Sequence, residues 1–332
     1  MKKKSRKVIG LLGAGVLLVL AVLLLYTVGR RLETSGQSQQ RGELAQTEQE
    51  QTCVVDGITY RKRSDIMSIL IMGVDRDSTQ QSDSPYEGGQ ADFQRLIVLD
   101  TAHGTVQQLK IDRDTITDVV MLGYLGSPIG TQKMQISLAH GFGDGREESC
   151  EYAQQAVEAL LGEDTVDYYL AMNLDGIPTL NDLAGGVTVT LEDDFSAMDP
   201  AMVRGATLTL HGKQAEYFVR SRMNIGEGTN EARMVRQEAY LEQLLTQLHG
   251  QLGQEKQRTA EVLDAMADYM VTDMPRGRMI NEIWAARDYT VEPALALEGE
   301  HKIAEDGFME FYPTESSIQQ AVLELFWEPV TG

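Results

Sequence analysis

A long apolar segment near the N-terminus constrains this chain more than any other feature. It runs from Val8 to Val28 without a charged residue, with five basic residues before it and Arg30 and Arg31 after it. Such a segment can span a bilayer as a helix, and its denser basic flank favours the cytoplasmic side. We therefore expect a cytoplasmic tail (1–7), a single-pass anchor in the cell membrane (8–28) and an extracellular remainder. A cleaved signal peptide is the alternative, but the segment is longer than the apolar core of such peptides.

The remainder of the chain is strongly acidic. Seven of the 29 basic residues and none of the 50 acidic residues precede Leu32, which leaves 22 basic against 50 acidic residues and a formal charge of about −28. A field of this sign repels nucleic acid, so we expect no nucleic acid among the partners of this chain.

The extracellular part divides into a stalk and one large domain. Residues 29–52 are rich in Gln, Ser and Glu and poor in large apolar side chains, which predicts a flexible stalk. Residues 53–332 are sufficient to bury a substantial core. Cys53 and Cys150 belong to this part, and their spacing is compatible with a disulfide or with two thiols.

Apolar runs and helical periodicities alternate along the domain. Short apolar runs predict strands at 67–73, 96–99, 106–111, 168–172 and 187–191, with a hairpin turn at 100–104 and further strands within 289–297 and 308–312. Helical spacing predicts helices at 151–161, 175–183, 234–248, 259–270 and 316–325. Interleaved strands and helices predict an α/β fold with a mixed central β-sheet in an α-β-α sandwich.

A cluster of arginines stands out in so acidic a domain. It consists of Arg220, Arg222, Arg233, Arg236 and Gln237. The first two are two residues apart, so an extended segment over 217–222 would present both on one side, and the last three share one face of a helix expected to begin near Asn230. Converging guanidinium groups bind phosphate bidentately, which predicts an anion site. The alternative for each arginine is a surface charge or a salt-bridge partner.

Charged residues also mark the ends of the first three strands. Asp75 follows the first strand and Asp92 opens the second, and two such carboxylates are the usual protein ligands of Mg²⁺ beside a substrate phosphate. Arg113 and Asp114 follow the third strand, at the edge where α/β folds bind ligands. Arg113 is a candidate for the anion site, and Asp114 for orienting an arginine or accepting a proton. Turn-capping aspartates and a structural Arg-Asp pair are the alternatives.

Several common catalytic motifs are absent. The sequence has no GxSxG, P-loop, HExxH or paired CxxC motif, which argues against the commoner hydrolases, nucleotidases and zinc sites. Among the histidines, His140 beside Gly141 and Gly143 is the one that we keep as a site candidate.

The order of these motifs resembles the LytR-CpsA-Psr family, also called the cell envelope-related transcriptional attenuator domain. The resemblance covers roughly residues 65–250. Its motifs are the anchor, Gly73-Val74-Asp75, Asp92, Arg113-Asp114, Gly185-Gly186-Val187, Arg220-Ser221-Arg222 and Arg233-x-x-Arg236-Gln237. No single motif is specific, but the ordered set is.

The resemblance implies a membrane-anchored, Mg²⁺-dependent phosphotransferase. Such an enzyme transfers a glycopolymer, for example teichoic acid or capsule, from undecaprenyl pyrophosphate to peptidoglycan during cell wall assembly. It implies Asp75 and Asp92 as metal ligands and catalytic roles for Arg113, Asp114, Arg220 and Arg222. The implied pyrophosphate-binding residues are Arg113, Arg220, Arg222, Arg233, Arg236, Gln237 and Lys133. The alternatives are a non-catalytic envelope protein that binds polyprenyl phosphates or wall polymers, and a polyprenyl pyrophosphatase.

The chain departs from the family pattern at several positions. Asp112 stands where the family usually has Pro, Gln135 where it usually has Lys, and Asn230 where it usually has Asp. Lys133 is close enough to Gln135 to substitute for the missing lysine. The departures indicate a divergent branch with a different donor glycan or altered activity.

Overall fold

The structure is a computed structural model of the chain. It describes residues 51–76, 88–162, 165–221, 225–226, 255–305 and 307–330, together with six helical residues between 236 and 247. The expected membrane anchor and the site candidates Arg222, Arg233 and Gln237 lie outside these residues. Within the described ranges, no helix is both long and apolar enough to cross a bilayer.

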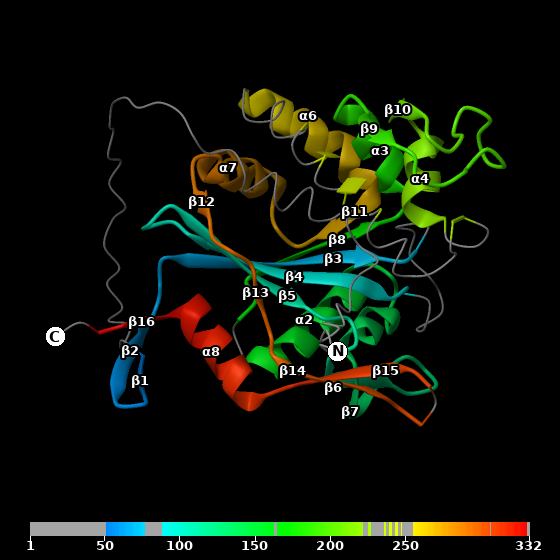
Figure 1. The fold of residues 1–332 in the computed structure, drawn as a ribbon. Helices are drawn as coiled ribbons and strands as arrows, with labels where there is room; N and C mark the ends of the chain where they lie inside the picture. Colours follow the sequence, from blue (N-terminus) through cyan, green and yellow to red (C-terminus); the bar gives the residue numbers. More distant parts are fainter. Residues whose placement is uncertain are drawn as a thin grey trace, which may run out of the picture.

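A mixed β-sheet forms the centre of the domain (Figure 1). Its strands, in spatial order, are β11 (Met270–Thr272), β8 (Tyr168–Asn173), β3 (Ile66–Val74), β4 (Ala91–Asp100), β5 (Thr105–Ile111) and β12 (Thr290–Val291), with β13 (Leu295–Ala296) also paired to β5. Strand β3 runs parallel to β8 and antiparallel to β4. Its continuous apolar sequence follows from burial on both faces.

Two layers cover the faces of this sheet. The upper layer in Figure 1 contains α3 (Gly176–Leu183), α4 (Lys213–Arg220), α6 (Lys256–Met266), α7 (Arg276–Ala286) and the β9–β10 hairpin (Val187–Thr190, Thr207–Leu210). The lower layer contains the 3₁₀ helix η1 (Ile136–Gly141), α2 (Glu147–Leu161) and α8 (Glu315–Phe326). Alternate residues of β3 supply the two cores: Ile69 and Ile71 pack in the upper one, Leu70 and Met72 in the lower one. The expected α-β-α arrangement is therefore present.

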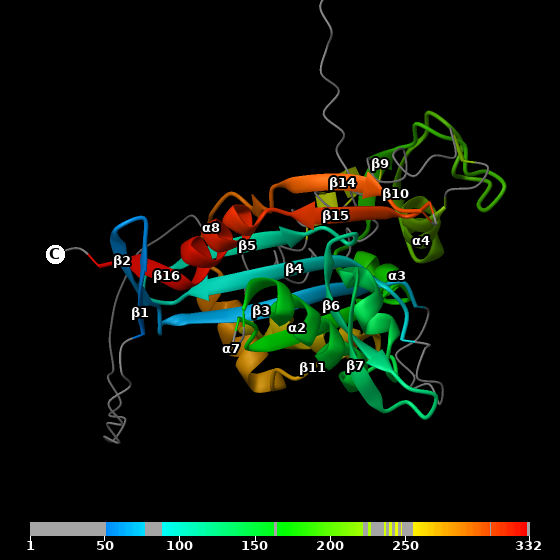
Figure 2. The ribbon, with the colours of Figure 1, turned by 90° about the horizontal axis from the view of Figure 1, so that it is seen from below.

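Smaller hairpins complete the domain. Strand β2 (Ile58–Lys62) pairs with β1 (Thr52–Val55) on one side and β16 (Trp327–Pro329) on the other, at the left end in Figure 1 and opposite the end of β3. Strands β6 (Ile116–Leu122) and β7 (Pro128–Gln135) follow β5. Strands β14 (Gly299–Ile303) and β15 (Met309–Pro313) form a hairpin that Figure 2 shows on the side where β5 lies, away from β11. The 3₁₀ turn η2 (Ala267–Tyr269) links α6 to β11.

The structure confirms most of the predicted elements, with shifts at their ends. The confirmed strands are those at 67–73, 96–99, 106–111, 168–172 and 187–191, and the confirmed helices are those at 151–161, 175–183 and 316–325. The helix predicted at 259–270 ends at Met266, before β11. Cys53 and Cys150 are both free thiols.

The extended conformation considered for residues 217–222 is not present at residues 217–220. Residues 213–220 form helix α4, because Ala215, Phe218 and Val219 recur at helical spacing and bury one face. Arg220 is the last residue of this helix, so the strand geometry expected to align it with Arg222 does not form.

Candidate active site

The site lies where β3 ends and β4 begins. The backbone amide of Asp75 donates to the carbonyl of Gln90 over 2.9 Å, which joins the two strand ends. Next to this hydrogen bond, the pairing of β3 with β4 shifts through a β-bulge: Val74 pairs with Ala91, and Gly73 pairs with Phe93. The bulge leaves Asp92 outside the regular ladder, and such irregularities re-aim a side chain. The two predicted metal ligands therefore stand at neighbouring positions on one edge of the sheet.

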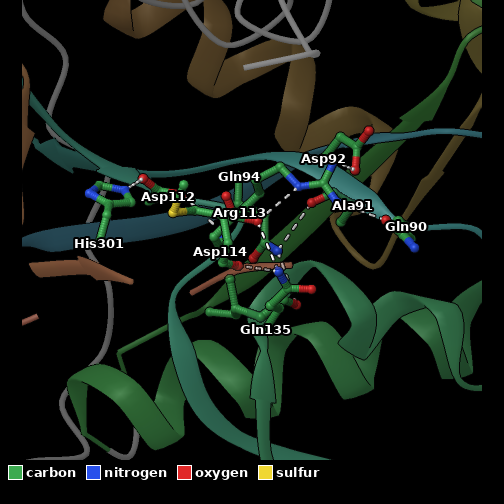
Figure 3. Close-up of polar contacts among 11 residues, drawn as sticks. Gln90, Ala91, Asp92, Gln94, Asp112, Arg113, Asp114, Gln135 and His301 are labelled. Carbon is green, nitrogen blue, oxygen red and sulfur yellow. Dashed lines mark hydrogen bonds and ion pairs between the residues drawn. The ribbon is translucent and has the colours of Figure 1, made fainter. Parts of the chain in front are cut away.

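Arg113 occupies the centre of this edge (Figure 3). Its Nη1 lies 2.7 Å from Asp92 Oδ1, its Nε lies 3.5 Å from Asp114 Oδ1, and its Nη2 donates to Gln90 Oε1 over 2.8 Å. The side chain remains 31% exposed, so an incoming anion can reach the guanidinium. The contact between Arg113 and Asp92 was not predicted from the sequence, and the anion-binding role of Arg113 stays a prediction.

Asp114 lies in the turn between β5 and β6, next to Arg113. Its Oδ1 also accepts from Gln135 Nε2 over 3.1 Å. Burial raises the pKa of the Asp114 carboxyl above its ordinary value; Arg113 and His301 oppose this shift, and the negative charge of Asp112 adds to it. A carboxylate with a raised pKa beside an arginine suits a proton acceptor.

His140 supports this edge from below. It is buried, and its Nδ1 lies 3.1 Å from the carbonyl of Gly89, next to Gln90. Burial lowers the pKa of His140 to about 4, so the ring is neutral and donates this hydrogen bond. A Cβ on Gly88 would lie 2.0 Å from the His140 carbonyl, so the glycine permits this close approach. His140, kept as a candidate from its neighbouring glycines, therefore shapes the backbone under the site.

The acidic pair fits a hard divalent cation. Asp75 and Asp92 supply carboxylate oxygens at adjacent strand ends, which is the donor type that Mg²⁺ prefers. The Oδ1 of Asp92 is ion-paired with Arg113. A cation bound at Asp92 would therefore compete with the guanidinium, which would be released toward a phosphate.

A second arginine group lies in the upper layer. Arg236 Nε donates to the Phe218 carbonyl over 2.6 Å, its Nη2 donates to the Ser221 carbonyl, and its Nη1 lies 3.5 Å from Asp193. The guanidinium also stacks over the rings of Phe195 and Phe218, at 5.1 and 5.7 Å from their centroids. The structure thus places Arg236 in a packed position beneath the end of α4.

Arg220 and Lys133 have carboxylate partners of their own. Arg220 Nη1 lies 2.9 Å from Glu216 on the same helix, and Lys133 Nζ lies 3.0 Å from Asp118 across the β6–β7 hairpin. Gln135, rather than Lys133, contacts Asp114. The role of Lys133 in binding pyrophosphate stays a prediction.

Comparison with known proteins identifies the family. The model of the LytR_cpsA_psr family matches residues 26–321, which is most of the chain. The chain belongs to the LytR-CpsA-Psr family. The prediction made from the ordered motifs is thereby confirmed.

Several members of the LytR-CpsA-Psr family can be compared with the chain directly. It is 23% identical over 264 residues to the polyisoprenyl-teichoic acid–peptidoglycan teichoic acid transferase TagU of Bacillus cereus (strain AH820), covering 79% of each protein. Its fold is similar to that of protein gbs0355 from Streptococcus agalactiae, with a TM-score of 0.59, 23% identity, and coverage of 79% of this chain and 87% of that chain. TagV of B. subtilis matches with a TM-score of 0.55, 20% identity, and coverage of 79% and 96%.

Proposed function

We propose that the chain is a membrane-anchored phosphotransferase that moves a glycopolymer from undecaprenyl pyrophosphate to peptidoglycan in cell wall assembly. The observation that carries the proposal is the contact of Arg113 with Asp92 and Asp114 at one edge of the sheet. This edge carries the guanidinium of Arg113, the strand-end residues Asp75 and Asp92, and Asp114, whose carboxyl has a raised pKa. The B. cereus relative, which is named as a transferase of polyisoprenyl-linked teichoic acid to peptidoglycan, supports the same reaction class.

The residues at this edge suit transfer of a phosphoryl-linked group. A hydroxyl of the acceptor sugar attacks the phosphorus that carries the glycan, the new P–O bond forms, and the bond to the bridging pyrophosphate oxygen breaks. The hydroxyl proton passes to Asp114, and undecaprenyl phosphate leaves with the bridging oxygen. Arg113 neutralises the charge that grows on the phosphate oxygens, and this electrostatic contribution dominates such reactions.

We propose that Asp75 and Asp92 hold Mg²⁺, which supplies charge neutralisation for the diphosphate. With a cation held by Asp75 and Asp92, Arg113 would lose its ion pair with Asp92 and would be available to bind the anion.

The test uses the full-length chain in detergent with Mg²⁺, a lipid-pyrophosphate-linked wall polymer and peptidoglycan. We expect transfer of the polymer, and a loss of about 100-fold in kcat/KM for Arg113→Ala. Arg258→Ala is the matched control, because Arg258 has similar exposure and pairs with Glu261 on its own helix, α6. Unchanged transfer by Arg113→Ala would contradict the assignment.

The same assay separates the alternatives. A binding protein would retain the lipid without turnover, whereas a pyrophosphatase would release phosphate in the absence of peptidoglycan. Either result in the wild-type protein would overturn the transferase assignment.

A further inference from the structure

The β14–β15 hairpin contacts the site from the C-terminal part of the chain. Two of its residues contact the turn that follows β5: the Phe311 amide donates to the Asp114 carbonyl over 2.7 Å, and His301 Nε2 lies 2.9 Å from Asp112 Oδ2. A third, Met309, accepts through its carbonyl from Gln135, at the end of β7, over 2.5 Å. Figure 3 shows His301 and Asp112 on one side of Arg113 and Gln135 on another.

These three contacts converge on Asp114. Asp112 bridges His301 to the Asp114 backbone, because its other oxygen, Oδ1, accepts from the Asp114 amide over 2.9 Å. Gln135 bridges Met309 to the Asp114 side chain, because its Nε2 also donates to Asp114 Oδ1. The amide, the carbonyl and the carboxylate of Asp114 are therefore each connected to the hairpin, directly or through one side chain.

The two bridging residues, Asp112 and Gln135, both stand at positions where the chain departs from the family pattern. A proline at 112 would have no side-chain oxygen to accept from the Asp114 amide or from His301. Gln135 replaces a lysine with an amide whose two N–H groups reach both Asp114 and Met309. The departures and the hairpin therefore form one connected set of contacts.

We propose that the β14–β15 hairpin is a positioning element of the active site and that His301 is its positioning residue. The ring of His301 is itself oriented by Phe311, with ring centroids 4.5 Å apart. Through Asp112 it holds the turn in which Asp114 and Arg113 face each other, so the hairpin determines where the guanidinium lies. The inference rests on the proposed function for its kinetic readout, but not for its structural one.

The kinetic test measures transfer by full-length variants. We expect His301→Ala to lower kcat about tenfold with little change in the KM for the lipid donor, because a displaced Arg113 loses contacts made in the transition state. His301→Gln retains a donor for Asp112 and should restore most of kcat. Asp112→Ala should lower kcat by the same factor as His301→Ala, and the double variant should have a kcat no lower than that of either single variant. Lys302→Ala is the control on the same strand, since Lys302 contacts Glu300 and Tyr312.

The structural test is independent of activity. Amide hydrogen exchange over residues 112–115 should accelerate in His301→Ala and remain at the wild-type rate in Lys302→Ala. Unchanged exchange in His301→Ala would overturn the proposal even if the protein has another function. A wild-type kcat for His301→Ala, or additive losses in the double variant, would overturn it for the transferase.

Discussion

Arg113, at the strand ends of the sheet, and Arg236, in the upper layer, differ in what holds them. Arg113 is held by side chains alone, namely Asp92, Asp114 and Gln90, and remains 31% exposed. Arg236 is held mainly by two backbone carbonyls and two aromatic rings, with Asp193 at 3.5 Å, and its side chain is 9% exposed. If Arg113 moves away, a metal cation or water can replace it at its carboxylate partners. The carbonyls at the end of α4 have no such replacement for Arg236.

The difference separates a ligand-binding arginine from a structural one. An arginine that leaves its partners to bind a phosphate must break contacts that water or a cation can replace. Arg113 satisfies this condition, and Arg236 does not. The family resemblance assigns the same pyrophosphate-binding role to both, so mutations can distinguish them.

The largest effect should come from Arg236. Replacement by Met leaves the Phe218 and Ser221 carbonyls and Asp193 without their donor, which should lower the free energy of unfolding by about 3–5 kcal/mol. Urea denaturation of the full-length protein measures this loss. Arg220→Ala is the matched control, because its exposed pair with Glu216 is worth only about 0.3–0.5 kcal/mol. Equal losses in the two variants would contradict the structural role of Arg236.

The support beneath Arg113 should be sensitive to acid. The pKa of His140 is about 4 in the folded protein and about 6.5 when unfolded, so the unfolded chain binds the proton first as the pH falls. The stabilisation is present above about pH 6.5 and is lost between there and pH 4, by about 3 kcal/mol. His140→Gln should flatten this part of the stability profile. An identical pH dependence in wild type and variant would be evidence against this role.

A conservative change at Arg113 should sharpen the contrast. Arg113→Lys keeps the charge but loses the planar fork that reaches Asp92, Gln90 and Asp114 together, so kcat/KM for transfer should fall about tenfold, or about 1.4 kcal/mol. Its unfolding midpoint should stay near that of the wild type, since the side chain is partly exposed. A large loss of stability in Arg113→Lys, together with normal transfer, would contradict the assignment and show that Arg113 is the structural arginine.

The smallest effect should be a shift in the pH profile. The negative charge of Asp112 contributes to the raised pKa of Asp114, after the larger effect of burial. Asp112→Asn removes this charge, so Asp114 should ionise at lower pH and the acidic limb of kcat/KM should move to lower pH. Initial rates across the acidic range check the direction. A shift to higher pH would show that Asp114 is not the titrating group.

The central sheet could be predicted because its strands are continuous apolar runs. The buried sequence Ile69–Met72 has one structural solution that satisfies its backbone and covers both faces. The charged residues at the strand ends were located from the same strands, but the contact between Asp92 and Arg113 was not predicted. Helix α4 was missed because the spacing of Arg220 and Arg222 in the sequence was given more weight than the helical spacing of Ala215, Phe218 and Val219.

The hairpin contacts could not be predicted from the sequence. Asp112 and His301 are 189 residues apart, and nothing local at either position specifies the other. Asp112 and Gln135 were recognised as departures, but their meaning depends on a partner strand whose own sequence is mostly exposed and shows no strong periodicity. Long-range pairing of this kind is decided by tertiary packing.

Because β2 pairs with both β1 and β16, the first and last described strands lie together at the end of the domain opposite the end of β3 (Figure 1). A proposed anchor at 8–28 would therefore hold the molecule by the end remote from its chemistry. The chain between Val28 and Gln51 has a contour length of at most about 80 Å. With the predicted anchor in a membrane, a segment of that length would limit how far from the anchor the domain could bind a lipid headgroup.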